Sequence, residues 1–413
     1  MNLYLFNDND SAALYGIGAY LNELTHALAG SAIKLHIVNL HSTRPKFEIV
    51  KTNKIENWYI PEAGYDNPSL DAIEEIEEYY RNVTFLLRLY ITDTKDLIFH
   101  FNYNQCYSLA KDLKAAFNCK TVAVVHYTKW SLELQGNLHG LRMIKTKPEI
   151  QRSSFEQMMY IAHEYEIALF NEVDRVIVLS GFMKRILETD CQIDSQKISV
   201  IPGGLKDKNP QQKIDRDEWR KKWHISGKES VILFVGRLQP VKGLTFLISA
   251  FRKVLEKIPD GRLIIAGSGN YENCFREAKD ICTKISFTGL LEKEDLQELY
   301  QIADVGVVPS LFETFGYVAV EMMMHELPIV STATTGLNEV VDDACGIKIP
   351  VIQHQEIAKI DVSSLSEKII YLLQHPNEAK LLGKNARIRY LNHYSTDIFR
   401  KNMLEFYQSL LIS

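Results

Sequence analysis

The sequence predicts an α/β protein of two domains, each built on a doubly wound parallel sheet. Three observations favour this fold class. The chain has 413 residues, which is more than one hydrophobic core usually serves. Short apolar, β-branched runs alternate with helical patterns from end to end, as successive βα units do. A polar and highly charged segment, Gly203 to Ser230, separates two sets of such runs, as an interdomain linker would.

The candidate strands fall into a set of six and a set of five. The first set is NLYLF (2–6), IKLHIVNL (33–40), DLIFHF (96–101), TVAVVH (121–126), RVIVLS (175–180) and ISVIP (198–202). The second set is VILFV (231–235), RLIIAG (262–267), ISFTG (285–289), VGVVP (305–309) and PIVST (328–332). We therefore expect one domain over residues 1–205 and another over 206–394. A terminal helix over 395–413, with a capping candidate at Ser395 or Thr396, should pack against the first domain.

Composition narrows the function classes. The formal net charge of −5 argues against nucleic-acid binding, which normally needs a basic face. Six scattered cysteines indicate reduced thiols rather than a disulfide framework. The N-terminus lacks the basic region of a signal peptide, and no stretch approaches the ~18 uninterrupted apolar residues of a membrane span. We expect a cytoplasmic protein, either in solution or peripheral to the inner face of a membrane.

The strongest candidate site follows the first strand of the second set. The segment GRLQPVKG brings Gly236, Arg237 and Lys242 to the carboxyl end of that strand, where open parallel sheets bind ligands. A guanidinium and an ammonium near a helix N-terminus would form a cradle for a diphosphate. The alternative is two solvent-facing charges. The order of residues is not that of a P-loop.

Other glycines and two histidines also follow candidate strands. Gly16 and Gly18 stand just ahead of an amphipathic helix, and the pair at 267 and 269 imitates half of a dinucleotide fingerprint, which leaves a nicotinamide-dependent dehydrogenase as an alternative. His126 ends a strand and is placed to donate to a phosphate or a sugar hydroxyl. His100 is equally compatible with a core position.

Two Asp-x-Asp pairs could suggest a magnesium diphosphate site. Asp8 and Asp10 lie in a polar loop, and Asp215 and Asp217 lie in the charged linker. Neither pair ends a strand that faces Arg237 and Lys242. We interpret both as solvated turns and expect no metal and no other cofactor.

Five stretches in register resemble one known family. They are VDRVIVLSGFMKRIL (173–187), VIPGGL (200–205), FVGRLQPVKGLTFLISAF (234–251), ADVGVVPS (303–310) and SLFETFGYVAVEMMMHELPIVST (310–332). In this order they resemble the retaining glycosyltransferases of family 4, which have the GT-B fold. The resemblance implies two Rossmann-like domains facing an interdomain cleft, with a nucleotide-sugar donor held mainly by the second. A sugar-nucleotide epimerase of the same fold remains an alternative.

The resemblance also assigns roles to residues. Arg237 and Lys242 would hold the donor diphosphate, Glu313 the sugar hydroxyls and Glu321 both ribose hydroxyls. His126 would contact the sugar or phosphate. The other implied donor-binding residues are Gly18, Gly236, Gly289, Leu290, Thr314, Phe315 and Gly316. The acceptor would attack from the front face with the leaving phosphate as base, so no protein nucleophile is expected.

The acceptor is less defined. Candidate acceptor residues are His100, Lys129 and Trp130, and the segment from Lys129 to Arg152 interleaves basic and apolar residues. This segment would suit a membrane surface, a lipid diphosphate, a peptide or a glycan; a solvated amphipathic helix is the alternative. The stretch HYTKWSLELQGN (126–137) resembles a Bacteroidetes subgroup found beside peptide-maturation genes, which leaves a peptide acceptor open. The sugar, the base and the oligomeric state are not predicted.

Overall fold

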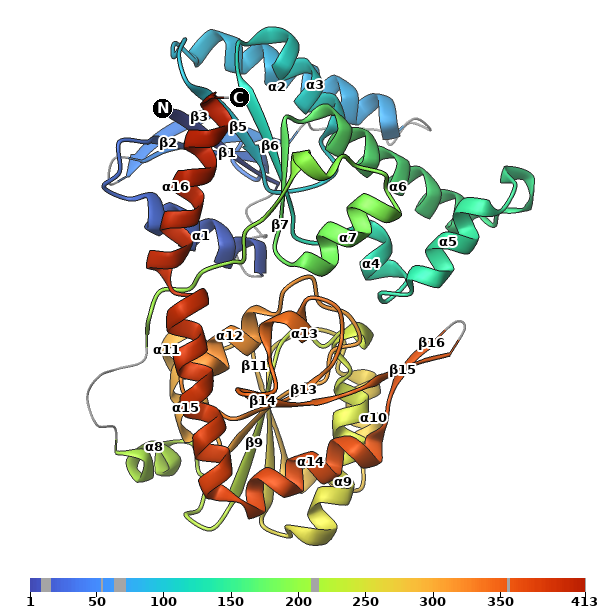
Figure 1. Ribbon diagram of the computed structural model, residues 1–413, viewed down its shortest axis with the longest axis vertical. Helices are drawn as coiled ribbons and strands as arrows, with labels where there is room; N and C mark the ends of the chain where they lie inside the picture. Colours follow the sequence, from blue (N-terminus) through green and yellow to red (C-terminus); the bar gives the residue numbers. More distant parts are fainter. Residues whose placement is uncertain (9–15, 53–54, 63–71, 209–214, 355–356, 413) are drawn as a thin grey trace. The chain divides into compact units, whose positions relative to one another are not determined.

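The computed structural model describes residues 1–8, 16–52, 55–62, 72–208, 215–354 and 357–412. The chain divides into two compact units (Figure 1). Unit 1 contains residues 1–130, 142–204 and 399–413. Unit 2 contains residues 131–141 and 205–398. The last helix contributes most of its length to unit 1, so the two ends of the chain belong to the same unit.

Unit 1 is built on an eight-stranded sheet with the order β3-β4-β2-β1-β5-β6-β7-β8. All neighbours pair in parallel except β3 and β4, which are antiparallel. The strands are β1 (Asn2–Asp8), β2 (Lys34–Ser42), β3 (Glu48–Thr52), β4 (Ile55–Pro61), β5 (Leu97–Phe101), β6 (Lys120–Val125), β7 (Arg175–Val178) and β8 (Ile198–Val200).

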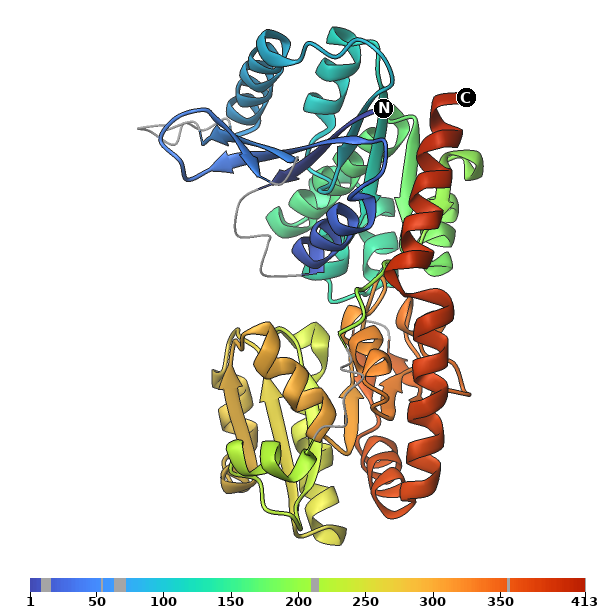
Figure 2. The ribbon, with the colours of Figure 1, turned by 90° about the vertical axis from the view of Figure 1, so that its left-hand side faces the viewer.

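Seven helices lie between these strands, and an eighth, α16, ends the described chain. They are α1 (Gly16–Leu28), α2 (Ala72–Tyr90), α3 (Tyr107–Ala116), α4 (Lys129–Glu133), α5 (Leu138–Thr146), α6 (Ser154–Glu172), α7 (Gly181–Thr189) and α16 (Thr396–Ile412). Figures 1 and 2 both show α16 beside the strands and α1 of unit 1. Its Arg400 donates to the carbonyl oxygens of Ala27 and Ala29 at 2.7 and 3.0 Å, as expected for a helix that completes this unit.

Unit 2 contains a six-stranded parallel sheet with the order β11-β10-β9-β12-β13-β14. Numbered within the unit, this is the order 3-2-1-4-5-6 of the dinucleotide-binding Rossmann fold. The strands are β9 (Ser230–Val235), β10 (Gly261–Ala266), β11 (Ile285–Gly289), β12 (Val305–Val308), β13 (Ile329–Thr332) and β14 (Gly346–Ile349). A separate antiparallel hairpin joins β15 (Val351–His354) to β16 (Ile357–Ile360).

Helices cover both faces of the second sheet. Figure 1 shows α11, α12 and α15 on one side of the strands and α9, α10 and α14 on the other. The apolar stripe of α9 is buried, with Leu247, Ile248 and Phe251 fully enclosed. The helices of unit 2 are α8 (Arg216–Lys222), α9 (Leu244–Lys257), α10 (Glu272–Ala278), α11 (Lys293–Ile302), α12 (Tyr317–Met324), α13 (Leu337–Val340), α14 (Val362–Gln374) and α15 (Pro376–His393).

The predicted fold class is confirmed: both units are doubly wound α/β units, and every strand predicted from the sequence is present. The strand predictions do not include β3, β4, β14 or the hairpin. β3 has four exposed residues out of five, and its sequence EIVKT lacks a continuous apolar run. Such edge strands are held by pairing with a neighbour rather than by burial.

Candidate active site

The carboxyl ends of β9 and β12 are neighbours at the centre of the second sheet. The chain leaves β9 toward β10 on one side, and β12 lies on the other, so this is the point where the strand order reverses. Loops diverge at such a point and leave room for a ligand. The loop that carries Arg237 and Lys242 follows β9, and the loop that carries Glu313 follows β12.

These two loops meet through an ion pair. Nζ of Lys242 lies 2.6 Å from Oε1 of Glu313, although the two residues are 71 positions apart. The hydroxyl of Ser310 donates to the same oxygen at 2.8 Å. The side chains of Lys242 and Glu313 are only 20% and 15% exposed. Lys242 is therefore not a solvent-facing charge, and its position is fixed by a partner rather than by chance.

The backbone of the Lys242 loop is equally constrained. A 3-10 turn covers Pro240–Lys242, and Gly243 follows with a left-handed φ of 68° before α9 begins. A Cβ atom on Gly243 would lie 1.9 Å from the carbonyl oxygen of Pro309. The amide of Leu311 donates to the carbonyl of Val241 at 2.8 Å, which ties the two loops together. Only glycine permits this approach.

The Glu313 loop is held from its other side by residues that follow β13. The hydroxyl of Thr335 accepts from the Glu313 amide at 2.8 Å and donates to the Glu313 carbonyl at 2.6 Å. The Gly336 amide donates to the same carbonyl at 2.9 Å. Sequence analysis did not identify Ser310 or Thr335. One signal for Thr335 was available in the sequence. It follows β13, the neighbour of β12, and residues that follow parallel strands lie at the same edge of the sheet.

Beyond Glu313 the chain enters α12 through Phe315, which is 2% exposed, and Gly316, whose φ is 111°. Glu321 stands inside this helix. Its Oε2 atom accepts a hydrogen bond of 2.5 Å from the hydroxyl of Tyr300, a buried residue of α11. Burial, followed by the charge and hydrogen bond of Glu321, raises the pKa of Tyr300 well above its usual value, so the phenol keeps its proton. Hydrogen bonds thus hold both carboxylates, Glu313 in the loop before α12 and Glu321 in the helix itself.

The ends of β9, β10 and β11 complete this edge. Gly236 follows β9, and Arg237 beside it is half-buried. The Gly236 amide donates to Ala266, and the Gly267 amide donates to Gly289, so the three loops are joined. Leu290, next to Gly289, is 53% exposed. The donor-binding residues predicted in the second half of the sequence thus end or follow β9, β11 or β12, or lie in α12.

The glycines at 267 and 269 have a packing explanation. A Cβ on Gly267 would lie 1.9 Å from the carbonyl oxygen of Gly236, and one on Gly269 would lie 2.9 Å from the backbone of Leu238. Both have φ values near 145° that favour glycine. The contact between neighbouring loops accounts for this pair without a dinucleotide.

Unit 1 contains two of the predicted donor-binding residues, His126 and Gly18. His126 is 9% exposed, lies edge-on to Tyr20, and has Nε2 3.4 Å from Oδ1 of Asn102. Burial lowers its pKa to about 3, so the ring is neutral at neutral pH. Gly18 is buried within the first turns of α1; the expectation that Gly16 and Gly18 precede the helix was wrong, because α1 already begins at Gly16.

Two of the candidate acceptor residues are core residues. His100 is fully buried and its Nδ1 lies 2.7 Å from the hydroxyl of Tyr407 in α16. Trp130 is 1% exposed. Both side chains are therefore enclosed in this structure. Lys129 is half-buried, and its amide donates to Oε1 of Glu166 at 2.8 Å.

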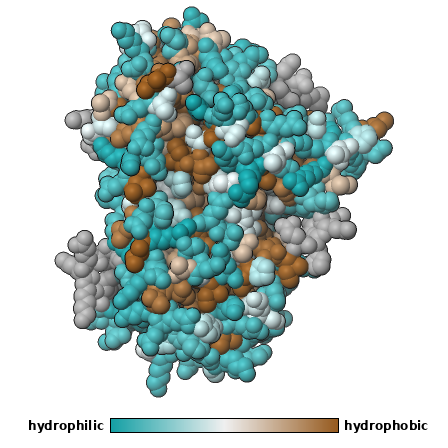
Figure 3. Space-filling model, in the orientation of Figure 1, coloured by the Kyte–Doolittle hydropathy of each residue, from teal (hydrophilic) through white to brown (hydrophobic). Residues whose placement is uncertain are grey.

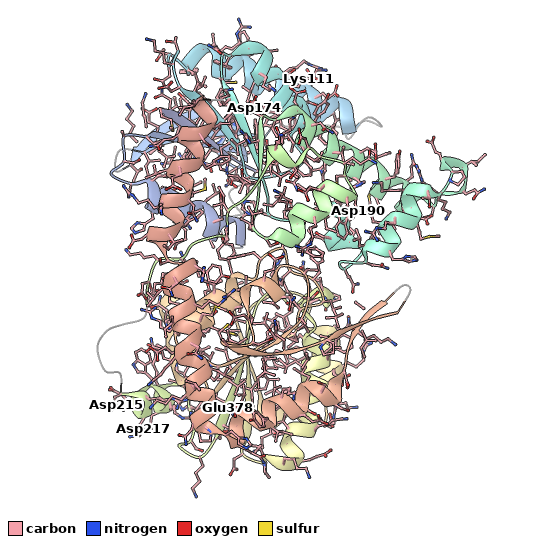
Figure 4. The ribbon with its side chains drawn as sticks, viewed as in Figure 1. Lys111, Asp174, Asp190, Asp215, Asp217 and Glu378 are labelled. Atoms are coloured by element: carbon pink, nitrogen blue, oxygen red, sulfur yellow. The ribbon has the colours of Figure 1, made fainter. Side chains whose placement is uncertain are left out.

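Basic residues of the segment from Lys129 to Arg152 bind partners within unit 1. Arg142 forms a bidentate pair with Asp190, with bonds of 2.6 and 3.1 Å; Figure 4 labels Asp190. Lys147 binds Glu156 at 2.8 Å, and the guanidinium of Arg152 lies 3.6 Å from the ring centroid of a tyrosine. These charges are neutralised or covered, which weakens the case for a lipid-phosphate patch. On the face drawn in Figure 3, hydrophilic residues predominate and hydrophobic residues form several groups among them.

The second Asp-x-Asp pair is part of a helix terminus. Asp215 is the N-cap of α8 and accepts from the amides of Asp217 and Glu218 at 3.1 and 3.2 Å; Figure 4 labels both aspartates. Asp10 of the first pair lies outside the described residues. In the described part of the chain, no group of three or more His, Cys, Asp or Glu residues is arranged to hold a metal ion. No helix among the described residues is long and apolar enough to span a membrane.

Two family models match the chain along most of its length. The model "Glycosyltransferase Family 4" matches residues 15–208, and the model "Glycosyl transferases group 1" matches residues 215–389. The chain belongs to the family 4 glycosyltransferases. Both carboxylates of the site, Glu313 and Glu321, together with Arg237 and Lys242, lie within the second match.

Individual proteins agree with this family 4 assignment. A D-inositol 3-phosphate glycosyltransferase from Mycobacterium sp. is 30% identical over 223 residues, which are 52% of this chain and 49% of that protein. The chain spans about half the length of the first curated relatives it matches. A sucrose-phosphate synthase from Thermosynechococcus elongatus has a similar fold, with a TM-score of 0.76, 22% identity and coverage of 100% and 99% of the two chains.

A second solved structure with this fold contains UDP-glucose. An Anabaena protein in complex with UDP-glucose matches with a TM-score of 0.73 and 15% identity, covering 99% of this chain and 100% of that one. These two likenesses confirm the GT-B fold for the family 4 chain.

Proposed function

We propose that this family 4 glycosyltransferase moves a hexose-type sugar from a UDP- or GDP-sugar to a glycan, lipid-linked or peptide acceptor, with retention of anomeric configuration and without a metal ion. The observation that carries the proposal is the ion pair between Lys242 and Glu313 at the point where the strand order of unit 2 reverses. A cation and a carboxylate that meet there suit the junction between a phosphate and a sugar.

In this proposal each charge faces one side of that junction. Lys242, with Arg237 beside the same strand end, would face the diphosphate, whose negative charge grows as the sugar leaves. Glu313 would accept hydrogen bonds from sugar hydroxyls. The first amides of α12, after Gly316, would add partial positive charge near the leaving group. Because Ser310 and Thr335 already hold Glu313, little reorganisation is needed when the donor binds.

Glu321 would bind the ribose from the second turn of α12. A carboxylate has two oxygens and can accept from two vicinal hydroxyls at once. Glu313 precedes α12 and Glu321 lies within it, so the diphosphate would lie between a sugar at Glu313 and a ribose at Glu321. His126 of unit 1 would meet the sugar or phosphate as a neutral donor, since burial keeps its ring unprotonated at neutral pH.

The donor class has support from related proteins. The Anabaena protein of the same fold is in complex with UDP-glucose, and the mycobacterial relative is named as a glycosyltransferase acting on D-inositol 3-phosphate. For this chain, transfer would proceed by attack of the acceptor on the donor face that the diphosphate leaves, with the phosphate as base. The described site residues then bind and orient, and none forms a covalent bond to the sugar.

A panel of UDP-, GDP- and ADP-sugars tests the proposal. The purified protein, with EDTA present, should hydrolyse one of them slowly and release the nucleoside diphosphate. Release of nucleotide that requires added metal would contradict the metal-independent part. A changed sugar without nucleotide release would indicate an epimerase, and binding of NAD(H) would indicate a dehydrogenase. The proposal fails if no nucleotide sugar is turned over and calorimetry detects no binding of UDP, GDP or ADP.

A further inference from the structure

Tyr300 lies behind the carboxylate that would bind the ribose, and none of the roles assigned above accounts for it. It belongs to α11, two residues before the end of that helix, and is 2% exposed. Its hydroxyl donates to Oε2 of Glu321 at 2.5 Å. A tyrosine this deeply enclosed usually packs as an aromatic residue and needs a partner for its hydroxyl. Here that partner is an ionisable residue of the proposed donor site.

A second residue holds the tyrosine from its flat side. The ring of His325 stacks on the ring of Tyr300, with centroids 5.3 Å apart and an interplanar angle of 13°. His325 closes the C-terminus of α12, and its amide donates to the carbonyl of Glu321 at 3.3 Å. Burial lowers the pKa of His325 to about 4, so it stacks as a neutral ring. Tyr300 is therefore fixed by α12 at both ends of the last helical turn.

The position of Tyr300 leaves the carboxylate able to act. A carboxylate offers about four acceptor sites, two on each oxygen. The Tyr300 hydroxyl occupies one site on Oε2, and a pair of vicinal hydroxyls requires one site on each oxygen. An unsupported Glu side chain rotates about three bonds, and fixing it on ligand binding costs conformational entropy. A hydrogen bond from a rigid phenol removes part of that cost in advance.

We propose that Tyr300 is a positioning residue that presents Glu321 to the ribose diol and so makes the donor site selective for ribonucleotides. This inference rests on the proposed function, because it assumes that Glu321 meets the ribose. It assigns to Tyr300 no contact with the nucleotide. The selectivity arises because only a ligand with both hydroxyls benefits from a carboxylate held in one orientation.

The test compares UDP with 2′,3′-dideoxy-UDP by calorimetry, using the purified protein and its Tyr300→Phe variant; GDP and its dideoxy analogue are run in parallel. Wild-type protein should prefer the ribonucleotide by about 10-fold or more, as expected for hydrogen bonds to a charged group. Tyr300→Phe should weaken the ribonucleotide by about 10-fold and leave the dideoxy form unchanged. Equal weakening of both nucleotides, or of neither, would overturn the inference.

Two further variants separate positioning from folding. Tyr390→Phe is the matched control, because Tyr390 is also fully buried in unit 2 and its hydroxyl donates to the carbonyl of Leu205 at 2.9 Å; it should keep the preference for ribonucleotide. Glu321→Asp keeps the charge but shortens the side chain, so this variant should lose the preference for the ribonucleotide. It provides a test that does not depend on whether Tyr300→Phe folds. Preference retained in Glu321→Asp counts against the inference. Wild-type protein that binds neither UDP nor GDP overturns the proposed function itself, whereas binding with an unaltered preference in Tyr300→Phe overturns only the role of Tyr300.

Discussion

Lys242 and Glu313 form an ion pair between the loops that follow β9 and β12, with Nζ and Oε1 2.6 Å apart. Both side chains are at least four-fifths buried, so most of their surface has no contact with water. Removing one partner of such a pair leaves an unbalanced charge in a poorly solvated place. The ion pair therefore joins the two loops. It also places two opposite charges where the donor bond would break.

Replacing Lys242 tests this arrangement most directly. Lys242→Met keeps the aliphatic stem but removes the charge, and we expect donor turnover to fall by ~100-fold or more because stabilisation of the leaving diphosphate is lost. Glu313→Gln should cause a loss of similar size. Lys253→Met is the control, since Lys253 is an exposed residue of α9 that binds only the Ser363 hydroxyl among the contacts described. Near-normal turnover in a folded Lys242→Met protein would refute the assignment.

Gly243 is expected to tolerate no side chain. Gly243→Ala places a Cβ 1.9 Å from the Pro309 carbonyl oxygen at a φ of 68°, so the loops must separate. We expect a loss of ~2 kcal/mol or more in the free energy of unfolding, together with reduced turnover. Gly227→Ala has no atom within 4 Å of the added Cβ and should change stability by less than ~0.5 kcal/mol. Urea unfolding of both variants provides the comparison; equal stabilities would contradict the structure.

Glu166 should make unit 1 sensitive to pH. Its side chain is buried, and burial raises its pKa to about 8 despite the hydrogen bond from the Lys129 amide. Because the folded protein holds this proton more tightly than the unfolded chain, the group stabilises the fold most below pH ~4.5. That contribution is lost as pH rises toward 8, by up to ~1.4 kcal/mol per unit.

Glu166→Gln removes this titration. The stability of the variant relative to wild type should rise steadily between pH 5 and pH 8, measured by urea unfolding at each pH. Glu164→Gln, on the exposed face of the same helix, serves as the control for the effect of the substitution itself. A difference that stays flat across this range would show that Glu166 titrates normally in the folded protein.

Tyr407 tests how strongly the terminal helix is attached to unit 1. Tyr407→Phe leaves the ring in place but takes the hydroxyl away from Nδ1 of the fully buried His100. A buried polar atom without its partner costs ~1–3 kcal/mol, so the thermal midpoint should fall. Tyr371→Phe removes a hydroxyl that bonds Glu378 at the surface, labelled in Figure 4, and should leave the midpoint unchanged. Equal midpoints for the two variants would contradict the contact with His100.

The sequence alone determined which segments become the central strands, because runs such as VILFV (231–235) are apolar throughout and only burial on both faces of a parallel sheet satisfies them. The same alternation of strands and helices placed Arg237, Lys242 and Glu313 directly after strands, hence at one edge of a sheet. Exposed edge strands such as β3 could not be predicted from apolar runs, because pairing with a neighbouring strand stabilises them rather than burial of apolar side chains.

Only the tertiary structure decided which of these residues meet. The order of strands makes β9 and β12 neighbours, and this alone brings Lys242 to Glu313 and explains why Gly243 must be glycine. The tertiary structure also shows that His100 and Trp130 are enclosed and that the Tyr300 hydroxyl donates to Glu321. The physical reason is that local sequence encodes polarity and backbone preference, whereas contacts between distant segments depend on how the whole sheet is assembled.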